Sequence, residues 1–280
     1  MDKSDHFRFV SLLALELDNG DISLPSLPDV VSKIRSMLER DDCDFDKISQ
    51  AVSVDPVLVS KLFVYANSAY YNRANMKIET LDAVIGRLGF EVVRNTAMSL
   101  AMKQLYNSDK HDNTASQQRK IWARGMKMSS MAFAIAQKAP ELNQETAFLC
   151  GLMHEVGKLY ILTKAEDFPD LLGDTASLQL VYDEWNPQIS KSIIESWGFS
   201  DDVIHTADPA SYVQQDTDAP ADLVDVIVVA RLLLDGIEAS LEDVFEEDVS
   251  CQRLGIDKNA APTLMSAYRE KLQSMQQSLS

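Results

Sequence analysis

The sequence has 280 residues, of which 46% are hydrophobic and 25% are charged, so it can bury a full core without disulfides or a structural metal. Its 43 acidic residues outnumber its 26 basic residues, which gives a formal net charge of −17. A surface with this charge repels phosphate backbones, and no dense block of Lys and Arg offsets it. We therefore expect no direct binding to nucleic acid.

The cysteines and the apolar runs indicate in which cellular compartment the protein is expected. The three cysteines lie far apart, form no CxxC pair and follow no secretory signal, which is typical of reduced thiols in a cytoplasmic protein. The most apolar run, residues 223–234, is too short to span a bilayer and contains Asp225 and Arg231. We therefore expect a buried helix there and no membrane segment.

The first half of the chain shows helical periodicity interrupted by capping residues. An apolar stripe from Phe7 ends at Asn19-Gly20, and Pro28 suits the first turn of the next helix. Asp55-Pro56 predicts an N-cap followed by proline at the first helical position, and Gly89 predicts a corner between two helices. The apolar positions behind these helices are Val30, Val31, Ile34, Met37, Leu38, Leu58, Leu62, Phe63, Ala66, Leu81, Val84, Ile85, Leu88, Val92, Val93, Ala97 and Leu100.

The second half begins after a polar stretch at 107–118, which predicts an exposed loop or a frayed helix start and a change of subdomain. No segment beyond it alternates like a strand. The predicted fold class is therefore all-α, with two helical lobes. The helices expected here begin with Ile121–Ile135, Glu145–Met153 and Val156–Thr163, continue with two helices around 171–181 and 189–197, and end with helices at 221–237 and 260–277.

Several motifs occur in a fixed order and together resemble the HDOD (HD-related output domain) family. The motifs are Leu24-Pro25-Ser26-Leu27-Pro28, Asp55-Pro56, Lys61-Leu62 with Ala66-Asn67-Ser68-Ala69, Ile85 with Leu88-Gly89, Ala147-Phe148-Leu149, and Gly151-Leu152-Met153-His154-Glu155-Val156-Gly157-Lys158-Leu159. The resemblance runs from about residue 20 to about residue 237. Together with the periodicity of the flanking segments, it leads us to expect an N-terminal helix at 1–19, an HDOD-like domain at 20–240 with lobes of about 20–110 and 115–240, and a C-terminal helical extension at 241–280. The second lobe would be an HD-like helical bundle.

The same resemblance allows the metal site of the related HD phosphohydrolases to be tested. His154 stands at the histidine of the core motif, but Glu155 replaces the aspartate. Arg124 stands on the upstream helix where the enzymes carry a histidine ligand, and Asn186 replaces a further histidine. A guanidinium offers no lone pair and repels a cation. The resemblance therefore implies no metal, no cofactor and no catalytic residue.

The number and positions of the histidines also argue against a metal site. The chain has 4 histidines, and His6 and His111 lie in the N-terminal helix and the polar loop. His154 and His205 remain, and His205 falls short of the family's paired histidines. A His–carboxylate site with Glu155 as a substitute ligand stays open as an alternative.

The motif region allows two interpretations. In the first, His154 is a partly buried residue that buttresses the helix after it. In the second, a remnant pocket suits an anionic ligand such as a nucleotide phosphate better than a metal. The candidate residues of this remnant pocket are Arg124, His154, Glu155, Lys158 and Asn186.

Three other features favour structural explanations. Cys150 lies four residues before His154, but a free cysteine in an apolar helix is usually part of the core. The methionines at 98, 102, 126, 128 and 131 recur at helical spacing, which predicts core filling before an adaptable groove. The acidic segment 242–248 has no Ca²⁺-loop spacing and is expected to be a solvated face or a docking surface for a basic partner.

The HDOD resemblance implies a function. We expect a non-enzymatic signal-transduction or scaffolding module of bacterial type that binds a signalling protein partner. The alternatives are a phosphohydrolase of nucleotides or cyclic dinucleotides with a substituted metal site, and a nucleotide sensor that uses the remnant pocket. The missing metal ligands favour the non-enzymatic module, and Glu155 as a substitute ligand is the only feature that favours the phosphohydrolase.

Overall fold

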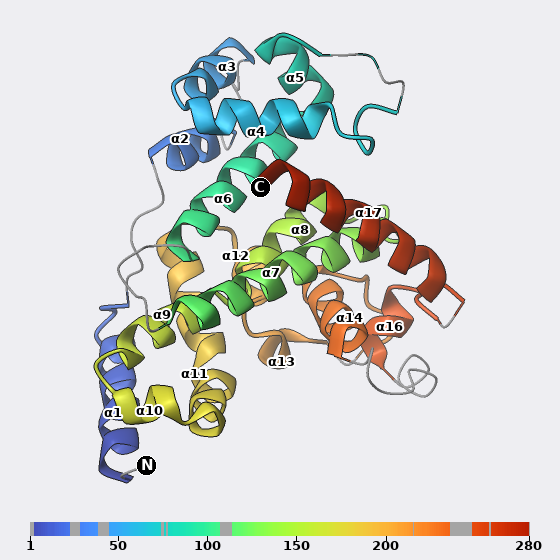
Figure 1. The fold of residues 1–280 in the computed structure, drawn as a ribbon. Coiled ribbons are helices and arrows are strands. Elements are labelled where there is room, and N and C mark those ends of the chain that lie inside the picture. Colours follow the sequence, from blue (N-terminus) through green and yellow to red (C-terminus); the bar gives the residue numbers. More distant parts are fainter. Residues whose placement is uncertain are drawn as a thin grey trace.

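The computed structural model describes residues 3–22, 29–38, 45–73, 76, 78–106, 114–214, 216–235, 248–257 and 259–279. Within these ranges the chain folds into helices and contains no strand, which confirms the predicted all-α class (Figure 1). The Leu24–Pro28 motif and His111 lie outside the described residues. Of the acidic segment 242–248 only Asp248 is described, and its side chain caps the helix that follows it.

The first lobe is a group of short helices at one end of the molecule (Figure 1). The Asp55 carboxylate accepts hydrogen bonds from the amides of Val57 and Leu58 at 2.9 and 3.0 Å, and Pro56 follows it in the first turn. Gly89 has φ 76° and turns the chain into a long helix toward the second lobe. The helices are α2 (Asp29–Leu38), α3 (Phe45–Ser53), α4 (Pro56–Ala66), α5 (Leu81–Leu88) and α6 (Phe90–Tyr106).

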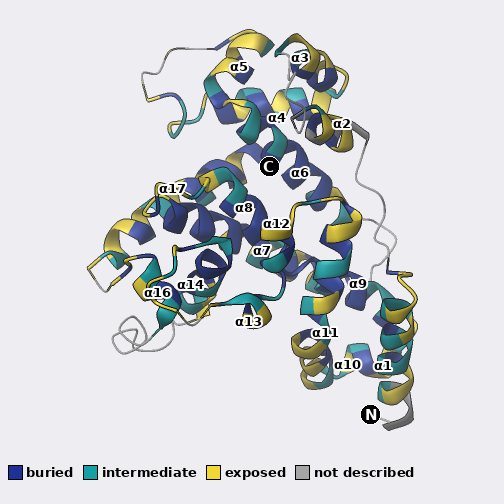
Figure 2. Ribbon diagram, turned by 180° about the vertical axis from the view of Figure 1, so that it is seen from behind, coloured by how far each residue is buried: buried dark blue, intermediate teal, exposed yellow. Residues whose placement is uncertain are grey.

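The second lobe is built around two closely packed helices, α7 and α8, and most residues of both helices are buried (Figure 2). Helix α7 starts at Ala115, so the last part of the polar stretch 107–118 is a helix start, one of the two structures expected there, but Gln118 is buried rather than exposed. The helices are α7 (Ala115–Ala136), α8 (Gln144–Met153), α9 (Val156–Ala165), α10 (Pro169–Gly173), α11 (Thr175–Ser196), α12 (Asp201–His205), α13 (Pro209–Tyr212), α14 (Leu223–Asp235), α16 (Val249–Arg253) and α17 (Ala261–Leu279).

Helix α1 (Lys3–Asp18) lies against the second lobe, beside α10 and α11, although it precedes the first lobe in the sequence (Figure 1). The Phe9 and Phe168 rings meet edge to face with centroids 5.1 Å apart. The Tyr160 hydroxyl donates to Glu16 at 2.7 Å, and Lys164 pairs with the same carboxylate. The N-terminal segment therefore closes the far end of the second lobe.

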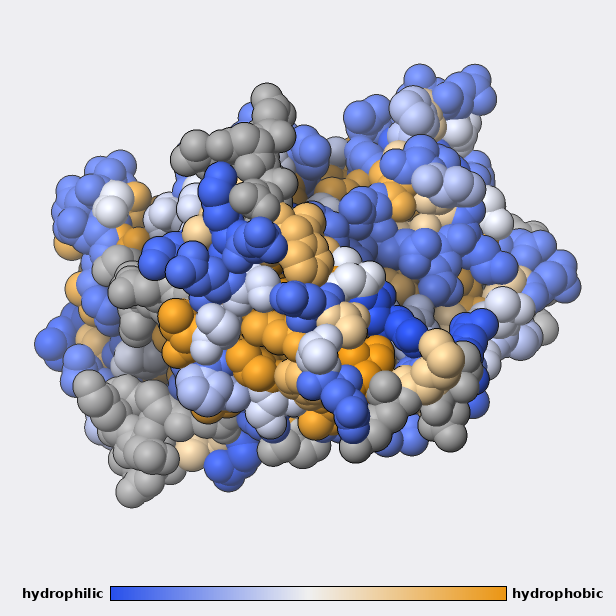
Figure 3. All heavy atoms as spheres, turned by 90° about the horizontal axis from the view of Figure 1, so that it is seen from above, coloured by the Kyte–Doolittle hydropathy of each residue, from blue (hydrophilic) through white to orange (hydrophobic). Residues whose placement is uncertain are grey.

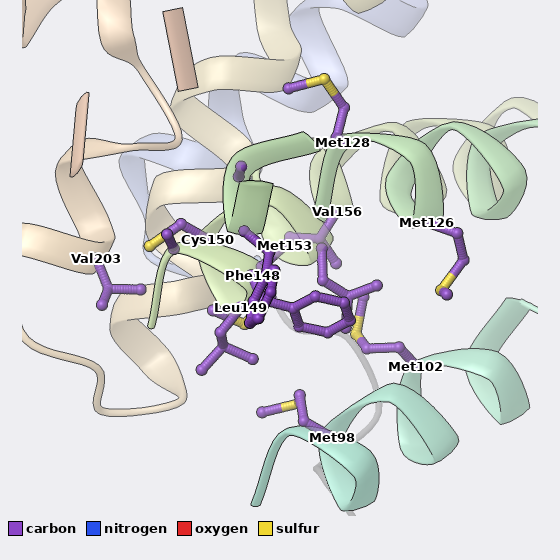
Figure 4. Close-up of a cluster of buried hydrophobic side chains, with 14 of the residues drawn as sticks. Met98, Met102, Met126, Met128, Phe148, Leu149, Cys150, Met153, Val156 and Val203 are labelled. Carbon is purple, nitrogen blue, oxygen red and sulfur yellow. The ribbon is translucent and has the colours of Figure 1, made fainter. Parts of the chain in front are cut away.

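The methionine cluster is core. Met98 and Met102 on α6 point toward Phe148 on α8 (Figure 4). These methionines and Met126 and Met128 of α7 are at most 4% exposed. Cys150 is equally buried, and burial raises the pKa of its thiol to about 12, so it lacks the thiolate that a nucleophile needs. Unbranched side chains fill the irregular space where three helices converge.

Gly151 allows α7 and α8 to approach at backbone distance. A Cβ atom at this position would lie 2.7 Å from the Met128 carbonyl oxygen and 2.7 Å from the backbone of Ser129. We expect Gly151→Ala to lower the free energy of unfolding by about 1–3 kcal/mol through overpacking, measured by urea denaturation. Gly86→Ala is the matched control, because a Cβ there meets nothing within 4 Å and should add about 0.5–1 kcal/mol of stability. Equal gains at both glycines would contradict the close approach.

The surface of the first lobe carries a few exposed apolar side chains. Val54, Val57, Val64 and Met76 are between 44% and 71% exposed. The face seen from above shows apolar groups interspersed among hydrophilic residues (Figure 3). Among the helices that the structure describes, none combines the length and the apolar character that crossing a membrane requires.

Candidate functional site

The core motif places His154 and Glu155 at the junction of α8 and α9. Helix α8 ends at Met153, His154 follows as its C-cap, and Glu155 precedes the first residue of α9. The His154 ring nitrogen Nδ1 lies 3.0 Å from the Gly151 carbonyl oxygen. The imidazole therefore buttresses the end of the helix before it, whereas the sequence suggested the helix after it.

Glu155 is surrounded by cationic side chains. Its Oε1 atom lies 2.6 Å from Lys158 Nζ and 3.3 Å from Arg124 Nε, and only 9% of its side chain is exposed. Burial alone would raise the pKa of this carboxyl, but His154, Lys158 and Arg124 oppose that effect and lower it to about 2. Glu155 is therefore ionised at neutral pH, and Lys158 and Arg124 compensate its charge.

Arg124 joins two parts of the second lobe. Its Nη1 and Nη2 atoms bind the Asp235 carboxylate at the end of α14, at 2.9 and 3.2 Å. The same side chain reaches Glu155 through Nε. One guanidinium on α7 thus bridges a carboxylate at the start of α9 and another at the end of α14.

His154 is buried, with 3% of its surface exposed. Burial lowers its pKa to about 4, so the imidazole is uncharged at neutral pH. Its Nε2 atom lies 3.7 Å from Glu155 Oε1, a contact that involves no imidazolium charge at that pH. The histidine is an internal neutral residue rather than an exposed base.

Asn186 connects α11 to the start of α9. Its Oδ1 atom accepts hydrogen bonds from the Lys158 amide and the Ser190 hydroxyl, both at 3.0 Å. The Ser190 hydroxyl in turn accepts from the Gly157 amide at 2.8 Å. These bonds satisfy backbone donors in the first turn of α9, which gives Asn186 a structural task.

A cavity of about 270 Å³ lies beside these groups. Four of the five residues predicted for the remnant pocket line it, whereas Arg124, which contacts Glu155, is not a lining residue. Within the described part of the chain, the buried atoms His154 Nε2, Glu155 Oε2 and Tyr182 OH have no hydrogen-bond partner. The cavity is lined by His154, Glu155, Lys158, Tyr182, Asp183, Asn186, Pro187, Ala207, Asp208, Pro209, Ala210 and Arg231.

A divalent metal does not fit this donor set. His154 and Glu155 supply two donor side chains, whereas protein metal centres need more, and Lys158 and Arg124 already contact the carboxylate. Across the ranges that the structure describes, no group of three or more His, Cys, Asp or Glu side chains is placed to hold a metal. His205 stacks on the Tyr212 ring, with centroids 3.8 Å apart.

The helical lobes and the altered motif at the α8–α9 junction define a protein of the HD-related class. Residues 24–209, well over half of the chain, match the HDOD domain family. The chain therefore belongs to the HDOD family, which confirms the resemblance seen in the sequence.

Solved structures show the same fold. The crystal structure of a candidate metal-dependent phosphohydrolase from Shewanella amazonensis SB2B superimposes with a TM-score of 0.81 at 22% identity, covering 97% of this chain and 99% of the other. An HDOD domain protein of unknown function from Geobacter sulfurreducens gives a TM-score of 0.68 at 19% identity, covering 94% and 96%. At these identities the likeness establishes the fold and not an activity.

One curated relative extends beyond this chain. An uncharacterized protein of Treponema pallidum (strain Nichols) is 21% identical over 207 residues, which cover 69% of this chain and 39% of the relative. The matched region thus spans about two fifths of the relative's length.

Proposed function

We propose that this chain is a non-catalytic signalling module that acts by binding protein partners. The observation that carries the proposal is the pair of cations beside Glu155. Lys158 Nζ at 2.6 Å and Arg124 Nε at 3.3 Å both contact the Oε1 atom, which a metal ligand would have to offer to the metal. Membership of the HDOD family and the loss of the other histidine ligands support the same conclusion. A helical fold whose Glu155 carboxylate is paired with cations can still bind protein partners through its surface without performing hydrolysis.

Elemental analysis with an activity assay tests the proposal. We expect purified protein to carry no stoichiometric Fe, Mn, Zn or Ni, and to leave nucleotides and cyclic dinucleotides intact, because two donors hold a metal weakly. His154→Ala should change neither result, and Lys158→Ala is the control for losing one cation beside Glu155. Stoichiometric metal that disappears in His154→Ala, together with hydrolysis, would establish the phosphohydrolase instead.

A second candidate is a sensor of a small polar ligand, such as a nucleotide, in the 270 Å³ cavity. The buried atoms His154 Nε2, Glu155 Oε2 and Tyr182 OH favour it, because unpaired buried polar atoms are costly and a ligand can satisfy them. Glu155 already binds Lys158 and Arg124, so the charge available to a phosphate is smaller than the sequence suggested. A nucleotide panel that leaves the melting temperature unchanged at millimolar concentration would remove this candidate.

A further inference from the structure

Lys271 is a buried lysine whose ammonium lies inside a ring of aromatic side chains. It belongs to the C-terminal helix α17, and 1% of its surface is exposed. Its Nζ atom lies 3.8 Å from the Phe133 ring centroid and 5.0 Å from that of Phe148. We call the surrounding set the ammonium cage: Tyr65, Tyr70, Tyr71, Phe133 and Phe148, with the carboxylate of Glu145.

Glu145 provides the counter-charge of the cage. Lys271 Nζ donates to Glu145 Oε1 at 3.0 Å and to the Tyr71 hydroxyl at 3.2 Å. The Tyr71 hydroxyl also donates to Glu145 Oε1, and Asn95 Nδ2 donates to Glu145 Oε2 at 2.9 Å. The carboxylate is thus held in place by groups other than the lysine. Aromatic faces with one fixed carboxylate form the arrangement that recognises alkylammonium groups.

The cage and its occupant come from different parts of the chain. Every cage residue lies within residues 24–209, the region that matches the HDOD family, whereas Lys271 lies outside it. Tyr65 is on α4 of the first lobe, and Phe133 and Phe148 are on α7 and α8 of the second. The residues within the family match therefore supply a complete cation site between the two lobes, and the C-terminal helix, which lies beyond that match, fills it.

Helix α17 leaves part of its binding groove open. A cavity of about 500 Å³ adjoins the cage at Tyr70 and is lined on the helix side by Glu270, Gln273, Ser274 and Gln277. The helix carries Arg269, Glu270 and Lys271, one net positive charge, in a chain whose formal net charge is −17. A basic helix is thus electrostatically complementary to the domain, and burying its ammonium costs desolvation that the cage offsets.

We propose that the ammonium cage is a docking site for a lysine side chain on a helix of a basic partner protein, and that α17 occupies this site in the absence of that partner. The inference rests on the proposed partner-binding role for the nature of the ligand. It does not rest on the absence of hydrolysis, so a metal-dependent activity would leave it standing. The partner's helix would displace α17 and insert its own ammonium beside Glu145.

Chemical rescue tests the cage in the full chain. Lys271→Ala removes the three outer methylenes and the ammonium, which n-propylammonium can replace. We expect n-propylammonium to raise the melting temperature of Lys271→Ala as its concentration rises, and 1-propanol to have no such effect. The wild-type chain should not respond, because its site is filled. Equal changes in the melting temperatures of the two proteins, or equal changes with the two additives, would contradict a specific ammonium site.

Displacement tests the helix occupant. The probe is a fluorescent peptide of residues 259–280, with a peptide carrying Lys271→Gln as its matched control. A resident helix that is released about 1% of the time weakens apparent affinity about 100-fold, so Lys271→Glu, which places a second carboxylate against Glu145, should bind the peptide up to about 100-fold more tightly than the wild-type chain. The Gln peptide should bind about tenfold more weakly than the Lys peptide.

A second measurement uses the wild-type chain, in case Lys271→Glu fails to fold. Excess unlabelled peptide should accelerate amide hydrogen exchange in the resident α17 and leave exchange in α9 unchanged. Two results would overturn displacement: equal binding of the Lys and Gln peptides, or unaltered exchange in α17 at saturating peptide. Either result would leave α17 as a permanent part of the fold, and neither depends on whether the protein hydrolyses nucleotides.

Discussion

Lys271→Met is expected to lower the free energy of unfolding by about 3 kcal/mol, because it leaves the largely buried carboxylate of Glu145 without its counter-charge. Methionine keeps most of the side-chain volume inside the aromatic ring, so the loss reports the charge rather than a large cavity. At about 2–4 °C per kcal/mol for a chain of this size, the melting temperature should fall by roughly 10 °C.

A double-mutant cycle isolates the interaction. Glu145→Gln combined with Lys271→Met should recover part of the loss, since neither buried charge then remains unpaired. Lys127→Met is the surface control, because Lys127 is exposed on α7 and should change stability by no more than about 0.5 kcal/mol. If the effects of the two single substitutions simply add, the Lys271–Glu145 pair makes no coupled contribution.

The contrast between α4 and the ammonium cage shows what the sequence could and could not predict. The start of α4 follows from Asp55 and Pro56 alone, because a cap involves residues two and three positions away. The Lys271–Glu145 pair joins residues 126 positions apart, so no local pattern marks it. A lysine in a polar helix predicts a solvent-exposed side chain, and only the packing of four helices buries it.

The motif region divides in the same way. The His154-Glu155 pair and its position between two helices follow from the sequence, because the family motif is contiguous. The placement of Arg124 against Asp235 and Glu155 required the approach of α7, α9 and α14, which periodicity does not specify. The packing of α1 against α10 and α11 could not be predicted from local sequence patterns either.

The stability of the protein is expected to fall as the pH drops below about 6.5, and His154 should cause the first part of this loss. Its folded-state pKa is about 4, whereas an unfolded histidine titrates near 6.5, so the unfolded chain binds more protons throughout this window. Each pH unit then costs about 1.4 kcal/mol, up to about 3 kcal/mol by pH 4. Glu155, with its pKa lowered to about 2, adds a further loss only below its unfolded value near 4.5.

His154→Gln separates the histidine from the carboxylates, because a neutral amide can still donate to the Gly151 carbonyl oxygen but does not titrate. Urea denaturation at pH 7, 6 and 5 should give a declining free energy of unfolding for the wild-type chain and a flatter one for the variant. Below pH 4.5 the two curves should fall together as Glu155 and other carboxylates are protonated. Equal slopes between pH 6.5 and 5 would mean that His154 is accessible enough to protonate in the folded state, which would place the imidazole within reach of solvent in the 270 Å³ cavity.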